Sequence, residues 1–162
     1  MRIAGLIRDS MVNGIGVRDV VFLQGCKHQC KGCHNPHTWN TDGGNEVDER
    51  ELALSLKSSP NDITISGGEP LLQYPKVLLF MYEVNKVNPN KHFWLYTGYK
   101  YEDVPETIWR MLSHYHLDVV VDGKFEQENK ESLRYCGSTN QRVIDLQKTV
   151  ESDEIVLWED NL

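Results

Sequence analysis

The sequence has no long hydrophobic run and no excess of positive charge. None of its apolar stretches approaches the roughly 20 residues that a membrane-spanning helix needs, and the opening MRIAGLIRDS reaches Arg8 and Asp9 after only a few apolar residues. This pattern predicts neither a membrane span nor a secretory signal. The formal net charge is −7, which argues against a general nucleic-acid or anionic-membrane surface. We therefore expect a cytoplasmic protein that binds neither nucleic acid nor membrane.

Internal repeats, low-complexity tracts and linkers rich in Pro, Gly or Ser are also lacking. A chain of 162 residues with 40% apolar composition has enough material for one sizeable core. We therefore expect a single domain that spans residues 1–162.

Short β-branched and apolar runs alternate with helical patterns along the chain. The predicted strands are residues 17–24, 62–66, 92–97 and 117–122. The predicted helices are residues 48–57, 75–87 and 103–114. Asp48 and Glu51 have the spacing of a capping box at the start of the first helix. Alternation of this kind predicts an α/β fold, either a partial (β/α) barrel or a curled, mostly parallel sheet.

Cysteine is scarce but clustered, because three of the four cysteines fall within eight residues. Cytoplasmic thiols stay reduced, so Cys26, Cys30 and Cys33 are expected to be metal ligands or redox groups and not disulfide partners. Two interpretations of this loop remain open. Three thiolates suit a cubane iron–sulfur cluster whose fourth iron has no protein ligand. They also suit a zinc site that His28, His34 or His37 completes.

A second unusual segment, SGGEP at residues 66–70, follows the apolar run ITI. Gly67 and Gly68 permit close approach to the backbone at a strand end, and Glu69 is expected to point its carboxylate near a ligand pocket, where it could receive an ammonium group. Such a turn is as often a plain connector between strand and helix. Because ligands collect at the carboxyl ends of parallel strands, one pocket is expected to gather the cysteine loop, this turn, Thr97–Gly98 and Gly123.

Together, CxxxCxxC and GGEP resemble the motifs of the radical S-adenosylmethionine (SAM) superfamily. The resemblance implies that Cys26, Cys30 and Cys33 hold a 4Fe-4S cluster whose open iron is chelated by SAM. It also implies that the turn contacts the SAM amino group and that the end of the third predicted strand lines the SAM pocket. The SAM-contacting residues implied in this way are Gly67, Gly68, Glu69, Thr97 and Gly98.

More closely, the chain resembles the glycyl-radical enzyme activases of the family that activates anaerobic ribonucleoside-triphosphate reductase. The segments that carry this resemblance are NGIGVR, FLQGCKHQCKGCHNPHTW, SGGEP, YTGY, DVVVDGKF and GSTNQRVID, between about Gly14 and Asp145. Gly32 stands where many superfamily members have an aromatic residue, and Ile15 stands where the family often has proline.

The resemblance implies an oxidoreductase whose chemistry is supplied by its cofactors, without a catalytic acid–base pair. An external donor such as flavodoxin would reduce the cluster, SAM would be cleaved to a 5′-deoxyadenosyl radical, and a glycyl radical would form on the large subunit of the reductase. Two alternatives stay open: a radical SAM activase of another glycyl-radical enzyme, and a zinc-binding interaction module. Cys136 is expected to be a packed thiol, and the spacing assigns no role to Asn140, Gln141 or Arg142.

Overall fold

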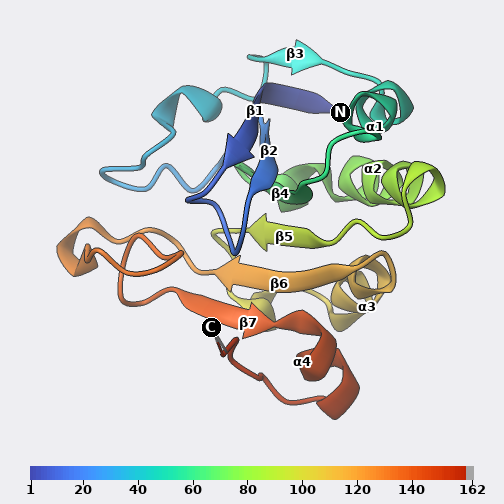
Figure 1. The fold of residues 1–162 in the computed structure, drawn as a ribbon. Coiled ribbons are helices and arrows are strands. Elements are labelled where there is room, and N and C mark those ends of the chain that lie inside the picture. Colours follow the sequence, from blue (N-terminus) through green and yellow to red (C-terminus); the bar gives the residue numbers. More distant parts are fainter. Residues whose placement is uncertain (160–162) are drawn as a thin grey trace.

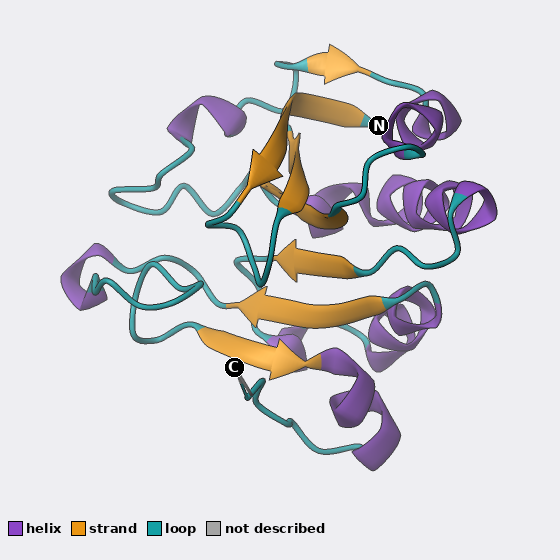
Figure 2. Cartoon of the chain, in the orientation of Figure 1, coloured by secondary structure: helices purple, strands orange, loops and turns teal. Residues whose placement is uncertain are grey.

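Four parallel strands form the centre of the structure, a computed structural model that describes residues 1–159 (Figures 1 and 2). They are β2 (Arg18–Leu23), β4 (Asp62–Gly67), β5 (Phe93–Tyr96) and β6 (Leu117–Asp122), and they pair side by side in that order. These are the four strands that the sequence predicts, within a residue or two at each end. The predicted α/β class and the parallel pairing are therefore confirmed.

Antiparallel strands that the sequence analysis did not identify extend this centre on both sides. The full order is β3-β1-β2-β4-β5-β6-β7, in which β1 (Arg2–Ser10) pairs with β2 and β3 (Asn45–Glu46), and β7 (Arg142–Asp145) pairs with β6. Within residues 1–159 the sheet is thus mixed, with seven strands and the edge strands β3 and β7.

The helices follow the predicted positions with one shift and one addition. They are α1 (Glu49–Leu56), α2 (Tyr74–Val87), α3 (Glu106–His114) and α4 (Leu146–Ser152). The predicted cap of α1 is present, since the Glu51 N–H donates to Asp48 Oδ1 over 2.9 Å. The third helix begins three residues later than predicted, because Val104 precedes Pro105 and takes an extended conformation. Among residues 1–159, no helix has the length and apolar character needed to cross a membrane.

The two faces of the sheet are covered differently. The main core lies on the helical face and includes Phe80, Leu95 and Trp109. On the other face, Trp94, Val119 and Val121 form a smaller core beneath loop residues. In Figure 1 the helices α1 to α4 lie on the right, whereas the cysteine loop and residues 123–141 project to the left, where β5 and β6 end. The loops at the carboxyl ends of these strands are therefore not covered by these four helices.

Arg18 ties the amino-terminal ends of the parallel strands together. The residue is only 2% exposed, its Nε donates to Thr64 Oγ1 over 2.8 Å, and its Nη2 donates to the carbonyls of Ile63 and His92. The guanidinium also lies 5.5 Å from the centre of the Trp94 ring. Burial lowers the pKa of Arg18 to about 10, so the group stays protonated at neutral pH.

Replacing Arg18 by Met should lower the free energy of unfolding by about 3 kcal/mol, because it leaves buried oxygen atoms without a charged donor. The matched control is Arg50→Met at an exposed position of α1, which should change stability by less than about 0.5 kcal/mol. Urea unfolding of the metal-free protein measures both. Equal stability of the two variants would contradict the role given to Arg18.

Candidate functional site

One pocket of about 460 Å³ lies at the carboxyl ends of the parallel strands. The segments that follow β2, β4, β5 and β6 all contribute to its lining, as the position of these segments in the sequence predicts. The candidate residues that line it are Cys26, Cys30, Cys33, Gly67, Gly68, Thr97 and Gly98. Glu69 is not part of this lining, and its carboxylate lies buried behind it.

The cysteine loop folds back on itself and is closed at its base by backbone hydrogen bonds. The Gly25 N–H donates to the Thr38 carbonyl over 2.7 Å, and the Cys26 N–H donates to the Trp39 carbonyl over 3.1 Å. Gly25 and Gly32 have φ angles of +99° and +74°, which residues other than glycine rarely adopt. The loop therefore returns to its starting point and brings its cysteines to the same pocket.

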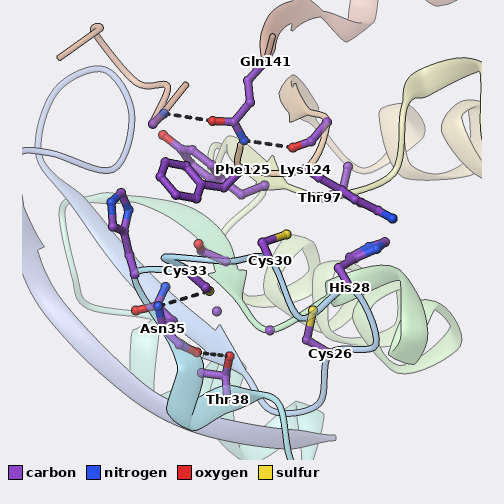
Figure 3. Close-up of a pocket in the computed structure, with 18 of the residues that line it drawn as sticks. Cys26, His28, Cys30, Cys33, Asn35, Thr38, Thr97, Lys124, Phe125 and Gln141 are labelled. Carbon is purple, nitrogen blue, oxygen red and sulfur yellow. Dashed lines mark hydrogen bonds between the residues drawn. The ribbon is translucent and has the colours of Figure 1, made fainter. Parts of the chain in front are cut away.

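Backbone N–H groups approach the sulfur atoms of all three cysteines. The Asn35 N–H donates to Cys33 Sγ over 3.3 Å (Figure 3). Burial raises the pKa of the Cys26 and Cys30 thiols, while nearby backbone N–H groups, including that of Phe125 at Cys30, act in the opposite direction. Such N–H groups stabilise negative charge on sulfur and are one means by which a protein tunes an iron–sulfur cluster.

The three thiolates at this pocket are the donor set of a 4Fe-4S cluster, in which each thiolate binds a different iron. A zinc site needs its ligands around a single centre. Trp39 also lines the pocket. Its buried indole Nε1 has no hydrogen-bond partner among the described residues.

The two glycines of the SGGEP turn are required by the neighbouring strand. A Cβ at Gly67 would lie 2.5 Å from the Leu23 nitrogen, and one at Gly68 would lie 2.3 Å from the Gly25 oxygen. The Gly68 N–H donates to Leu23 O, and the Glu69 N–H donates to Gly25 O, each over 2.8 Å. The turn is therefore joined to the start of the cysteine loop through backbone atoms.

Glu69 is 1% exposed and connects three segments of the site. Its Oε1 accepts hydrogen bonds from the Leu71 N–H (3.0 Å) and the Thr97 hydroxyl (2.8 Å). Its Oε2 accepts from the Gly98 N–H (2.8 Å) and lies 2.8 Å from Nε2 of His28 in the cysteine loop. Each oxygen thus has two protein partners. A direct contact between this carboxylate and the SAM amino group stays a prediction.

The sequence analysis expected Gly123 at the pocket, where the structure places it, but it assigned no contacts to the rest of the loop up to residue 141. Gln141 Nε2 donates to Gly123 O over 2.9 Å, and its Oε1 accepts from the Gly137 N–H over 2.8 Å (Figure 3). Asn140 Nδ2 donates to Lys124 O over 2.8 Å. These amide side chains join the two ends of the loop. Their contacts can be recognised only in the folded chain.

The sequence analysis gave Arg142 no role and expected Cys136 to be a packed thiol. Arg142 at the start of β7 donates from its Nε to Asp122 Oδ1 over 3.0 Å and also pairs with Glu102. Cys136 is half-buried and its thiol lies 3.9 Å from Gln141 O, which agrees with a packed thiol. Cys136 also lines the pocket.

Replacing Gly68 by Ala should lower the free energy of unfolding by about 2 kcal/mol or more, because the new methyl group would overlap the Gly25 carbonyl. The matched control is Gly5→Ala in β1, where no atom lies within 4 Å of the added Cβ. Urea unfolding, followed by iron uptake during anaerobic reconstitution, compares the two variants. The interpretation fails if Gly68→Ala is as stable as Gly5→Ala and takes up iron equally well.

Comparison with known proteins agrees with this site. Residues 12–144 match the model of a family described as a 4Fe-4S single cluster domain. The chain is 37% identical over 140 residues to a protein of Haemophilus influenzae, an alignment that covers 81% of this chain and 89% of the relative. A relative from Enterobacteria phage T4 is 40% identical over 141 residues, which cover 82% and 86% of the two chains.

A third relative, from Escherichia coli K12, is 34% identical over 143 residues, which cover 82% of this chain and 91% of that protein. All three relatives are named anaerobic ribonucleoside-triphosphate reductase-activating protein. The chain therefore belongs to the 4Fe-4S single cluster domain family and, within it, to the anaerobic ribonucleoside-triphosphate reductase-activating proteins.

Proposed function

We propose that this protein activates an anaerobic ribonucleoside-triphosphate reductase by generating a glycyl radical on its large subunit, with a 4Fe-4S cluster and SAM bound in the pocket. The observation that carries the proposal is that Cys26, Cys30 and Cys33 line the same pocket as the SGGEP turn. Membership of a family whose relatives carry that activity in their names supports the choice of the reductase.

Cys26, Cys30 and Cys33 are the proposed cluster ligands. Three thiolates leave one iron of a cubane without a protein ligand, which gives SAM a place to bind. When bound, the reduced cluster and SAM supply the one-electron chemistry that ends in removal of a hydrogen atom from a glycine of the partner. The N–H groups directed at the sulfur atoms would stabilise the negative charge of this centre.

Gly67, Gly68, Thr97 and Gly98 are the proposed SAM-contacting residues, because they line the pocket next to the cysteine loop. Glu69 contributes negative charge from behind the lining. Its Oε2 lies 2.8 Å from His28 Nε2 and accepts from the Gly98 N–H over 2.8 Å, and both of these residues line the pocket, so an ammonium group bound there would be attracted to the carboxylate. No residue is given the role of a general acid or base, since the cofactors perform the chemistry.

The partner's glycine must enter the pocket, whose rim includes exposed apolar side chains. Val12 is 79% exposed and Leu133 is 40% exposed, and both line the pocket. A protein partner that covers these side chains would also exclude water from the site.

The proposal further includes a single radical SAM domain over residues 1–162, with a partial (β/α) barrel or a curled, mostly parallel sheet of the radical SAM type. It also includes a cytoplasmic location and an electron donor such as flavodoxin.

Cys26→Ala should lose the cluster and the activity together, whereas Cys136→Ala should retain both. The reason is that the first substitution removes a proposed ligand, while the second removes a thiol that packs at the edge of the pocket. Iron and sulfide content after anaerobic reconstitution measures the cluster. Electron paramagnetic resonance of the reductase after incubation with SAM, reductant and each variant measures the glycyl radical.

Equal loss of iron in the two variants would contradict the ligand assignment. A glycyl radical that forms on a different glycyl-radical enzyme, and not on the reductase, would contradict the choice of partner. Retention of one zinc ion without bound iron or sulfide would contradict the cluster itself.

A further inference from the structure

His28 lies between two proposed cluster ligands and reaches across to the ends of β4 and β5. Its side chain is 9% exposed, and its Nε2 lies 2.8 Å from Glu69 Oε2. The ring also meets the Tyr99 ring edge to face, with centroids 4.6 Å apart. In Figure 3, His28 stands beside Cys26 in the cysteine loop. One side chain therefore links this loop to the turn after β4 and the segment after β5.

The other contacts of Glu69 indicate the direction of this hydrogen bond. The Leu71 N–H, the Thr97 hydroxyl and the Gly98 N–H all donate to its two oxygens. The carboxyl group is thus an acceptor throughout, and a His28 tautomer with its hydrogen on Nε2 completes the set of donors. The same Oε2 accepts from the Gly98 N–H over 2.8 Å. A hydrogen bond to a buried carboxylate is stronger than one between neutral groups. His28 thus shares its acceptor with the backbone of a residue that lines the pocket.

The backbone of Gly98 is shaped to receive this ring. A Cβ at Gly98 would lie 2.4 Å from His28 Cδ2 and 2.7 Å from Nε2, so any larger residue would push the imidazole away from Glu69. This close approach is independent of the hydrogen bond. Both observations indicate that the imidazole is held in one place by the segments after β4 and β5.

We propose that His28 is a positioning residue that holds the segment between Cys26 and Cys30 in fixed relation to Glu69 and Gly98. Through this contact, the proposed cluster ligands and the proposed SAM-contacting backbone keep one relative geometry. The inference deepens the proposed function and rests on it only for the identity of the two cofactors. His28 itself is neither a metal ligand nor a catalytic residue in this proposal.

Three variants test the proposal. His28→Phe keeps a flat ring but removes the donor, and His28→Gln keeps an N–H donor on a side chain of different shape. The matched control, His37→Phe, makes the same substitution at an exposed histidine of the same loop. If His28→Phe does not fold, His28→Leu serves as the donor-free variant. Unchanged hydrogen exchange in α2 verifies that each variant is folded.

The first measurement uses the metal-free protein under anaerobic, reducing conditions. Hydrogen exchange of residues 26–33 and of the Gly98 amide should be about tenfold faster in His28→Phe, as expected from loss of a hydrogen bond to a charged group. His28→Gln and His37→Phe should stay within about threefold of the parent protein. The proposal is overturned if His28→Phe exchanges like His37→Phe.

The second measurement uses the reconstituted protein and SAM. At equal iron content, His28→Phe should raise the dissociation constant for SAM about tenfold, with substantial recovery in His28→Gln. An unchanged dissociation constant in His28→Phe would overturn the claim that His28 fixes the position of the cysteine loop relative to the proposed SAM-contacting backbone. If the parent protein binds no iron, the proposed function fails, and the exchange measurement still decides whether His28 positions the loop.

Discussion

The buried carboxylate of Glu69 is the constraint on which the site depends. Burying a charge without partners is costly, and the four hydrogen-bond contacts around its two oxygens offset that cost. These partners come from the cysteine loop, the turn after β4 and the segment after β5. Because each partner must be in place to satisfy the charge, the carboxylate holds the three segments in one arrangement.

The parallel sheet supplies the frame for this arrangement. The parallel pairing of β2, β4 and β5 brings their carboxyl ends to one edge, and the helices leave that edge uncovered (Figure 1). Close backbone packing at Gly67 and Gly68 then joins the turn to the start of the cysteine loop. On the remaining side, Gln141 and Asn140 join the two ends of the loop of residues 123–141, which lines the same pocket as the cysteines. Local contacts at the strand ends therefore shape the pocket.

Much of this could be predicted from sequence, because the parallel strands are short β-branched runs and the three cysteines proposed as cluster ligands form a compact motif. The strand β1 was not recognised, since its exposed positions and Gly5 weaken the apolar pattern. The strand β7 and helix α4 are short, and their stability depends on packing against β6 and α3. The role of Glu69 was only partly foreseen, because a sequence motif shows that a carboxylate is present but not how many protein donors surround it. For the same reason, the contact of His28 with Glu69 became visible only in the folded chain.

The proposed site stands on three cysteines that hold a 4Fe-4S cluster with one iron left open for SAM. Electron paramagnetic resonance of the anaerobically reconstituted, dithionite-reduced protein, recorded with and without SAM, tests this arrangement. We expect the signal of a reduced cubane cluster whose shape changes when SAM is added. A protein that keeps zinc and binds no iron, or a cluster signal that SAM leaves unchanged, would contradict it.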